Sequence, residues 1–370
     1  MTEILLRNEP TYPIHVIPQC WNVFNQRNQI ERGLFFLEGQ KWYEMRKKMN
    51  PIFLKNPGLS LAASYSKKVT DKFIEDLRHQ IELKGFFQCE LETLLHKWSV
   101  ESTLASLYGN QYNINSKKLD EFVGYVHDMF DSSAILQTTS AEEAAELNSN
   151  DWQNFSTAAF GALQFLNEHF SKLLKTDGLV KVLDQCFNEE EIIRIANDLI
   201  IAAADTTSYT TLWTLYLMAI HEKYQNPPII SRGILRECMR LYPVAPFLTR
   251  IQQKPLIING YEIMEGQLVL ISAYAMGRDV SNFPNPDNFQ PERWLRKSNN
   301  GKINSFASLP FGFGSRSCIG KKMAEQQMEY FLEQFFKNFN LHCVNDQPVK
   351  MIMRMIGLPD VKILFNIKLK

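Results

Sequence analysis

The chain has 370 residues, of which 45% are hydrophobic and 12% aromatic, which is enough for a packed core. Its 40 basic and 40 acidic residues cancel, so bulk charge gives no support for nucleic-acid binding. Six scattered cysteines without CxxC spacing argue against a disulfide framework and against a zinc site. The apolar stretch at positions 4–6 is too short for a signal peptide or a membrane span.

Helical periodicity dominates the first two-thirds of the chain. Apolar residues recur at three- and four-residue spacings over positions 61–83, 90–108, 119–130 and 155–174, which predicts four amphipathic helices. Between the last two, the polar and small residues of positions 137–150 predict a mobile loop.

A much longer helix is predicted to begin after Asn188. Asn188 is a good N-cap, and Glu191 three residues later completes a capping-box pattern. The helical pattern then continues to about position 223 without proline or glycine. A helix of this length has to cross the whole molecule.

Strand signals come late in the chain. Positions 256–258 and 261–263 flank an Asn-Gly pair, which predicts a hairpin with a type I′ turn. Positions 267–273 and the alternating positions 361–370 are two further expected strands. No internal repeat or domain boundary is visible, so we expect a single, mainly α-helical domain with small β-sheets, of the α+β class.

The most specific signal is the sequence LPFGFGSRSCIG at positions 309–320, directly before another expected helix. If a haem binds here, Cys318 supplies an axial thiolate, which favours O–O cleavage. Gly314 and Gly320 let backbone N–H groups approach the sulfur. Arg316 is a natural partner for a haem propionate.

Two alternatives compete with this interpretation of the loop. One is a glycine-rich turn with an incidental buried cysteine. Five fixed positions within the ten residues that begin at Phe311 argue against it. The other is a dinucleotide-binding fingerprint. It is disfavoured because Ser317 stands at the third glycine position and no βαβ setting surrounds it.

The loop resembles the signature of the cytochrome P450 family. This resemblance implies the cytochrome P450 fold, haem b as cofactor, a monooxygenase reaction, and a long central helix that crosses over the haem. On that helix, alanines 202–204 would leave space for dioxygen and substrate, and Asp205 and Thr206 would relay protons through water. By itself, Thr206 could equally bond back to a helix carbonyl.

Further elements are similar to those of the family. Glu237 and Arg240 match an ExxR element on one helix face, and Arg293 lies in a PERF-like segment. The resemblance implies that these three residues form a buried structural triad. It also assigns haem contacts to Trp42, Arg46 and Arg250, although isolated arginines of this kind are more often solvated.

Within the family, the chain resembles the mitochondrial, ferredoxin-dependent branch and, more narrowly, arthropod ecdysteroid C2-hydroxylases. This implies hydroxylation of an apolar steroid, an ecdysteroid precursor, with O2 and electrons from an adrenodoxin-like ferredoxin. It also implies the matrix side of the inner mitochondrial membrane, where peripheral membrane association is an option. The resemblance assigns ferredoxin docking to Arg232, Arg236, Lys321 and Lys322, with a merely solvated basic face as the alternative.

A large apolar substrate needs an apolar pocket with few polar anchors. Each residue that the resemblance places in this pocket could equally be plain core. The candidates are Phe35, Phe36, Ala203, Val244, Phe247, Leu248 and Ile356.

The chain departs from the family's pattern in two places. By comparison with the family's pattern, we expect an N-terminal region and a targeting segment to be missing from the sequence, and only positions 227–236 lie between Asn226 and Glu237. We therefore expect residues 1–370 to form one P450 domain that is incomplete at its N-terminus. The alternative is a truncated or non-functional relative that binds haem poorly and has no turnover.

Overall fold

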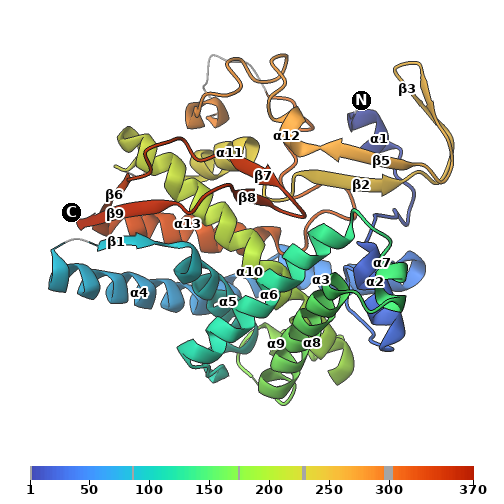
Figure 1. The fold of residues 1–370 in the computed structure, drawn as a ribbon, viewed down its shortest axis with the longest axis horizontal. Coiled ribbons are helices and arrows are strands. Elements are labelled where there is room, and N and C mark those ends of the chain that lie inside the picture. The colour runs from blue at the N-terminus through green and yellow to red at the C-terminus, as the bar shows by residue number, and fades with distance from the viewer. Residues whose placement is uncertain (1, 86, 174–175, 227–230, 296–302) are drawn as a thin grey trace.

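Figure 1 shows a computed structural model of the chain, which describes residues 2–85, 87–173, 176–226, 231–295 and 303–370. The helices are α1 (Thr2–Arg7), α2 (Gln19–Arg27), α3 (Gly39–Leu54), α4 (Gly58–Lys84), α5 (Glu92–Tyr108), α6 (Ser116–Leu136), α7 (Ala141–Glu146), α8 (Asn150–Phe170), α9 (Leu179–Leu183), α10 (Glu189–Ile220), α11 (Ser231–Leu241), α12 (Ala273–Met276) and α13 (Lys321–Asn338). Short 3-10 helices are Gly109–Gln111, Glu222–Tyr224 and Pro291–Trp294.

The strands are short, and all of their pairings are antiparallel. In chain order they are β1 (Phe87–Glu90), β2 (Phe247–Ile251), β3 (Leu256–Ile258), β4 (Tyr261–Ile263), β5 (Leu268–Ser272), β6 (Phe339–Cys343), β7 (Met351–Met353), β8 (Gly357–Pro359) and β9 (Leu364–Leu369). One sheet has the order β1-β9-β6, and the remaining strands pair as β2-β5, β3-β4 and β7-β8. The mainly helical fold with small sheets, predicted from the sequence, is confirmed.

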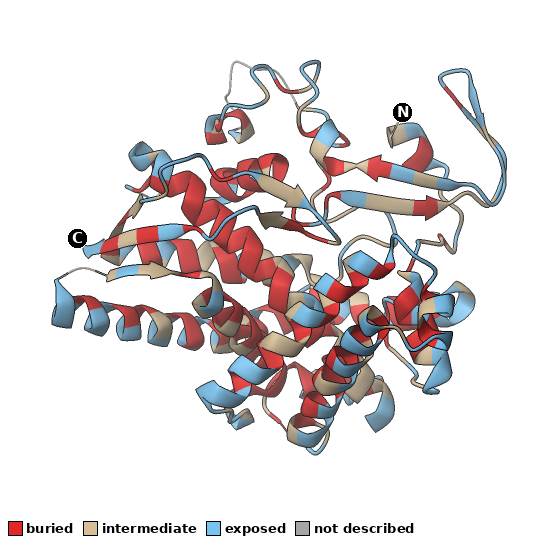
Figure 2. Ribbon diagram, in the orientation of Figure 1, coloured by how far each residue is buried: buried red, intermediate tan, exposed pale blue. Residues whose placement is uncertain are grey.

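Helix α10 runs through the centre of the molecule (Figure 1), and most of its surface is buried (Figure 2). The predicted capping box fixes its start: Asn188 Oδ1 accepts the Glu191 N–H at 2.9 Å, and Glu191 Oε2 accepts the Asn188 N–H at 3.0 Å. The helix ends at Ile220, slightly earlier than predicted, because His221 leaves helical geometry. Helices α5, α6, α8, α11 and α13 pack against it.

The predicted hairpin of β3 and β4 is present, and its turn residues Asn259 and Gly260 have φ angles of +51° and +83°. Such left-handed angles at both turn positions are those of a type I′ turn. The strand predicted at 267–273 is β5, and the one predicted at 361–370 is β9.

Positions 137–150 do not form the predicted loop throughout, because α7 lies within them. Ser140 caps this helix by accepting the Glu143 N–H, and two of its alanines, Ala141 and Ala145, are buried. Alanine and glutamate are good helix formers, so a polar composition was misleading here. Position 174 and part of 227–236 lie outside the described residues. Within the described ranges, no helix has the length and apolarity needed to cross a bilayer.

Candidate active site

The loop at positions 309–320 folds back on itself in front of α13. The Cys318 N–H donates to the Phe311 carbonyl at 2.8 Å, and Gly312 and Gly314 adopt φ angles of +71° and +70°. Glycine is favoured at such left-handed positions because a Cβ is strained there. The turn places Cys318 three residues before Lys321, the first residue of α13.

The Cys318 side chain is exposed, and its thiol forms no disulfide. Desolvation raises the pKa of this thiol, although the backbone N–H groups of Gly320 and Lys321 and the charge of Arg46 act to lower it. A bound metal cation would deprotonate such a thiol, so its surroundings fit an axial thiolate ligand.

Two arginines near this loop carry charges without an ion pair among the described residues. Arg46 is buried and donates to Asn50 Oδ1 at 2.8 Å, while Arg316 donates to the carbonyls of Pro13 and Leu37, both at 2.9 Å. The Arg316 guanidinium also stacks over the ring of the buried Trp42, with 4.1 Å to the centroid. The pKa of Arg316 is lowered to about 10, mainly by burial and also by the charges of Arg250 and Arg46, while Glu38 and Glu9 act to raise it.

The third arginine, Arg250, is buried and already holds a carboxylate. Its Nε lies 2.5 Å from Glu9 Oε1, and Glu9 also lies close to Gly314. Burial raises the pKa of Glu9, while the Arg250 charge acts to lower it. Three clustered guanidiniums thus face two carboxylates, Glu9 and Glu38. This surplus of positive charge fits the two propionates of a haem.

Sequence reasoning missed His15, which lies beside these arginines. Burial and the charges of Arg316 and Arg250 lower its pKa to about 4. Neither ring nitrogen has a hydrogen-bond partner among the described residues. The sequence gives no signal that a single histidine in a loop will lie beside arginines, because those arginines come from distant segments of the chain.

Helix α10 exposes a narrow face in its middle. Ala202 is exposed and Ala203 and Thr206 are half-buried, whereas the residues around them are mostly buried. The Thr206 hydroxyl donates to the Ala202 carbonyl at 2.7 Å, which is the back-bonding alternative considered from the sequence. The Asp205 carboxylate faces His96 of α5 and His127 of α6.

The structure brings Glu237, Arg240 and Arg293 together in the interior. Glu237 Oε1 accepts from Arg240 Nη2 at 2.7 Å and from Arg293 Nε at 2.9 Å, and all three side chains are almost completely buried. Sequence reasoning missed two further donors, the Gln290 N–H at 3.0 Å and Trp294 Nε1 at 2.8 Å. Helix α11 packs on α13, so the cluster supports the helix that follows Cys318.

The remaining predicted residues are spread over different environments. Among the substrate candidates, Val244 and Ile356 are buried, Phe36, Ala203 and Leu248 are half-buried, and Phe35 and Phe247 are 46% and 39% exposed. Ile356 lines a cavity of about 190 Å³ next to Asp205.

The predicted docking residues lie at the surface of α11 and at the start of α13. Arg232, Arg236 and Lys322 are exposed, and Lys321 is half-buried. Arg232 pairs with Glu329 at 2.8 Å, and Lys322 lies 3.7 Å from Glu325. Their charges are therefore partly balanced within the chain.

Comparison with known proteins agrees with this geometry. The family model "Cytochrome P450" matches residues 21–227 and 231–367. Mitochondrial cytochrome P450 315a1 of Drosophila melanogaster is 28% identical, over 96% of this chain and 75% of its own length. The mitochondrial 1,25-dihydroxyvitamin D(3) 24-hydroxylase of Mus musculus is 27% identical, over 97% and 76%. The mitochondrial cholesterol side-chain cleavage enzyme of Oncorhynchus mykiss is 26% identical, over 100% and 79%.

A haem bound through a cysteine thiolate supplies the activation of dioxygen in such proteins. The open thiol before α13, the arginine cluster and the small-residue face of α10 all fit that cofactor. The chain therefore belongs to the cytochrome P450 family, in its mitochondrial-type branch, and is a haem-dependent monooxygenase.

Proposed function

We propose that this monooxygenase hydroxylates a steroid, of the ecdysteroid-precursor type, with electrons from an adrenodoxin-like ferredoxin in mitochondria. The observation that carries the proposal is the exposed Cys318 thiol beside a surplus of buried positive charge. The names of the relatives support the substrate class, because two of them act on vitamin D and cholesterol. All three are named as mitochondrial.

Each predicted residue has a proposed task at this site. Cys318 is the axial ligand to iron, in a loop shaped by Phe311, Gly314 and Gly320. The propionates are held by Trp42, Arg46, Arg250 and Arg316. Asp205 holds a proton and Thr206 passes it on through water, while Glu237, Arg240 and Arg293 act only on the stability of the fold.

The basic residues of α11 and α13 are the proposed docking surface for an acidic ferredoxin. Arg236 is exposed, stacks over Trp294, and forms no ion pair among the described residues. Lys321 and Lys322 flank the loop of the proposed ligand, so a partner bound there would lie close to the iron. Electrostatic steering of this kind weakens as the salt concentration rises.

The test is reconstitution of the haem-loaded chain with an adrenodoxin-like ferredoxin, its reductase and O2. A panel of sterols, ecdysteroid precursors and fatty acids is supplied, and products are identified by mass spectrometry. We expect hydroxylated steroid products only. Hydroxylation of fatty acids alone would overturn the substrate class, and a chain that cannot hold haem would support the truncated, inactive alternative.

The docking surface has its own test. We expect Lys322→Glu to slow ferredoxin-dependent turnover several-fold at low salt, with the difference shrinking at high salt. Lys84→Glu, at the far end of α4, is the control for a change in net charge. Equal rates for Lys322→Glu and wild type at low salt would remove this surface from the proposal.

A further inference from the structure

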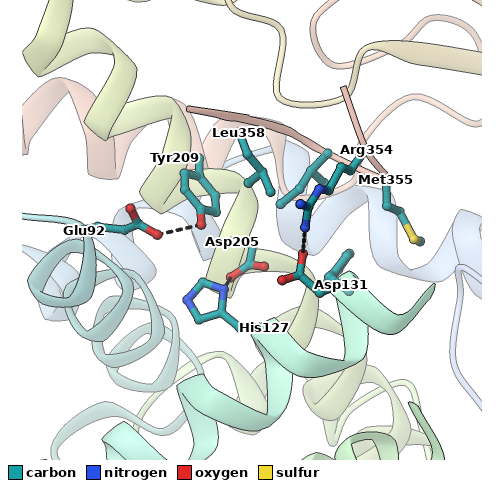
Figure 3. A pocket seen from close by; sticks show the side chains of 10 residues that line it. Glu92, His127, Asp131, Asp205, Tyr209, Arg354, Met355 and Leu358 are labelled. Atoms are coloured by element: carbon teal, nitrogen blue, oxygen red, sulfur yellow. Dashed lines mark hydrogen bonds and ion pairs between the residues drawn. The ribbon is translucent and has the colours of Figure 1, made fainter. Parts of the chain in front are cut away.

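Asp205 is a buried carboxylate without a hydrogen-bond donor. Its side chain is 1% exposed, and neither oxygen has a hydrogen-bond partner among the described residues. A buried charge is expensive unless it is paired or hydrogen-bonded, so the groups facing this carboxylate decide its protonation. Those groups are two histidines, His96 of α5 and His127 of α6. Figure 3 shows His127 beside Asp205.

His96 is oriented so that it can share one proton with Asp205. Its Nδ1 lies 2.8 Å from the Glu92 carbonyl, and because a carbonyl only accepts, Nδ1 must carry the hydrogen. The free Nε2 then faces Asp205 Oδ1 at 3.3 Å. The pair is favourable when one proton lies between these atoms, either on Asp205 or on His96, and two facing lone pairs would repel.

His127 connects this buried pair with the outside. Its side chain is 30% exposed, its Nδ1 lies 3.6 Å from the same Asp205 oxygen, and its ring stands edge-on to that of His96 at 4.3 Å. A separation of 3.6 Å is bridged by one water molecule or closed by a small rotation of the ring. His127 also lines the cavity of about 190 Å³, which has room for several water molecules.

The other carboxylates around this cavity have hydrogen-bond or ion-pair partners of their own. Glu92 Oε1 accepts the Tyr209 hydroxyl at 2.8 Å, and Asp131 forms an ion pair with Arg354 at 3.0 Å. Asp205 lines the same cavity but forms no hydrogen bond among the described residues, and its carboxylate lies against the two histidines. Of the three carboxylates, Asp205 is therefore the one placed to exchange a proton with them.

We propose that His127 and His96 form a proton inlet, which passes protons from cavity water to Asp205. The proposal rests on the proposed role of Asp205 in oxygen activation. Hydroxylation consumes the substrate C–H, O2, two electrons and two protons, and yields the alcohol and one water. Each proton that leaves Asp205 is replaced from His127 or His96, which recover theirs from the cavity. The histidines are positioning and relay residues that do not touch the substrate.

The test compares two oxidants in the haem-loaded enzyme. Turnover with O2 and ferredoxin needs two protons from solvent, whereas H2O2 brings its own two protons and electrons. We expect His127→Gln and His96→Asn to lower the O2-driven rate at least tenfold and to increase its solvent isotope effect. The H2O2-driven rate should stay within about twofold of wild type. The matched control is His342→Gln, which alters a surface histidine paired with Glu222 at 2.8 Å.

A second readout does not depend on turnover. In the diamagnetic, carbon monoxide-bound ferrous protein, the imidazole ¹⁵N signals of His96 and His127 should both move in Asp205→Asn, while that of His342 stays unchanged. Zn²⁺ is an additional probe, because the ligand atoms of Glu92, His96 and His127 lie within 4.8 Å of one another. It should slow the O2-driven reaction of the wild type and leave the H2O2-driven reaction unaffected.

Equal loss of both reactions in the histidine variants would assign them a structural role and overturn the inlet. The inlet would also be overturned if both variants behaved like His342→Gln. If His96→Asn fails to bind haem, the test rests on His127→Gln, which alters a partly exposed residue. A wild type without thiolate-bound haem would instead overturn the proposed function, so the two failures are distinguishable.

Discussion

Two carboxylates in the interior are equally buried but differ in the hydrogen-bond donors that surround them. Glu237 is 0% exposed and accepts N–H groups from Arg240, Gln290, Arg293 and Trp294. Asp205 is 1% exposed and accepts no hydrogen bond among the described residues, with His96 Nε2 at 3.3 Å and His127 Nδ1 at 3.6 Å as its nearest partners in charge. A carboxylate surrounded by donors is held in one position and stabilises the fold. One that lies against histidines is placed to exchange a proton with them, which is the role proposed for Asp205.

The largest effect is expected when the cluster around Glu237 is disrupted. Glu237→Gln keeps the size of the side chain but leaves two buried guanidiniums, Arg240 and Arg293, without a counter-charge. We expect the free energy of unfolding to fall by about 3–5 kcal/mol, measured by denaturant titration. Glu329→Gln removes only the exposed pair with Arg232 and should cost at most about 1 kcal/mol. Equal costs would show that burial does not distinguish the two pairs.

Asp205→Asn tests the second cluster. We expect O2-driven hydroxylation to fall about 100-fold, because the amide cannot transfer a proton, while the free energy of unfolding changes by less than about 1 kcal/mol. Asp198→Asn, on the same helix, removes an ion pair with Arg32 at 2.8 Å and should show the reverse pattern. An Asp205→Asn enzyme with wild-type rate would contradict the proton role.

A smaller effect is expected when only one neutral hydrogen-bond donor to Glu237 is removed. Trp294 donates to Glu237 Oε2 at 2.8 Å, and Trp294→Phe removes this donor while keeping an aromatic ring. Because other donors to Glu237 remain, we expect a loss of about 1–2 kcal/mol in unfolding free energy and unchanged turnover per bound haem. A loss as large as that of Glu237→Gln would mean that the tryptophan, and not the arginines, holds the cluster together.

The last prediction concerns His15, whose ring nitrogens have no hydrogen-bond partner among the described residues. Its pKa is about 4 in the folded chain, below the ordinary value of 6.5, so the folded state resists its protonation. Stability of the haem-free protein should therefore fall as the pH drops from about 6.5 toward 4, where only the unfolded chain takes up this proton. His15→Gln should remove the part of that fall that this proton causes, measured as the free energy of unfolding across this range. An unchanged pH dependence would contradict the lowered pKa.

Local patterns predicted the parts of the fold that depend on neighbouring residues. The capping box at Asn188 and Glu191 and the Asn259-Gly260 turn are examples, since each is complete within a few positions. The short helix α7 was missed because a polar composition was given more weight than the Ser140 cap and the helix-forming alanines. For α7, the helix-capping residue Ser140 was more informative than the polar composition of the segment.

Contacts between distant segments were not predictable in the same way. Arg46 and Arg250 looked like solvated residues when taken alone, yet both are buried next to the proposed ligand loop. Nothing in the sequence connects His96 and His127 with Asp205, because three separate helices have to pack before the side chains meet. Family resemblance pointed to Asp205, but only the structure shows what surrounds it.

The central claim is that Cys318 binds the haem iron, and one spectrum tests it most directly. The reduced protein is exposed to carbon monoxide, and its Soret band is compared for wild type, Cys318→Ala and Cys343→Ala. We predict a thiolate-type band for wild type and for Cys343→Ala, because Cys343 lies in β6, and no such band for Cys318→Ala. A thiolate-type band that persists in Cys318→Ala would contradict the account.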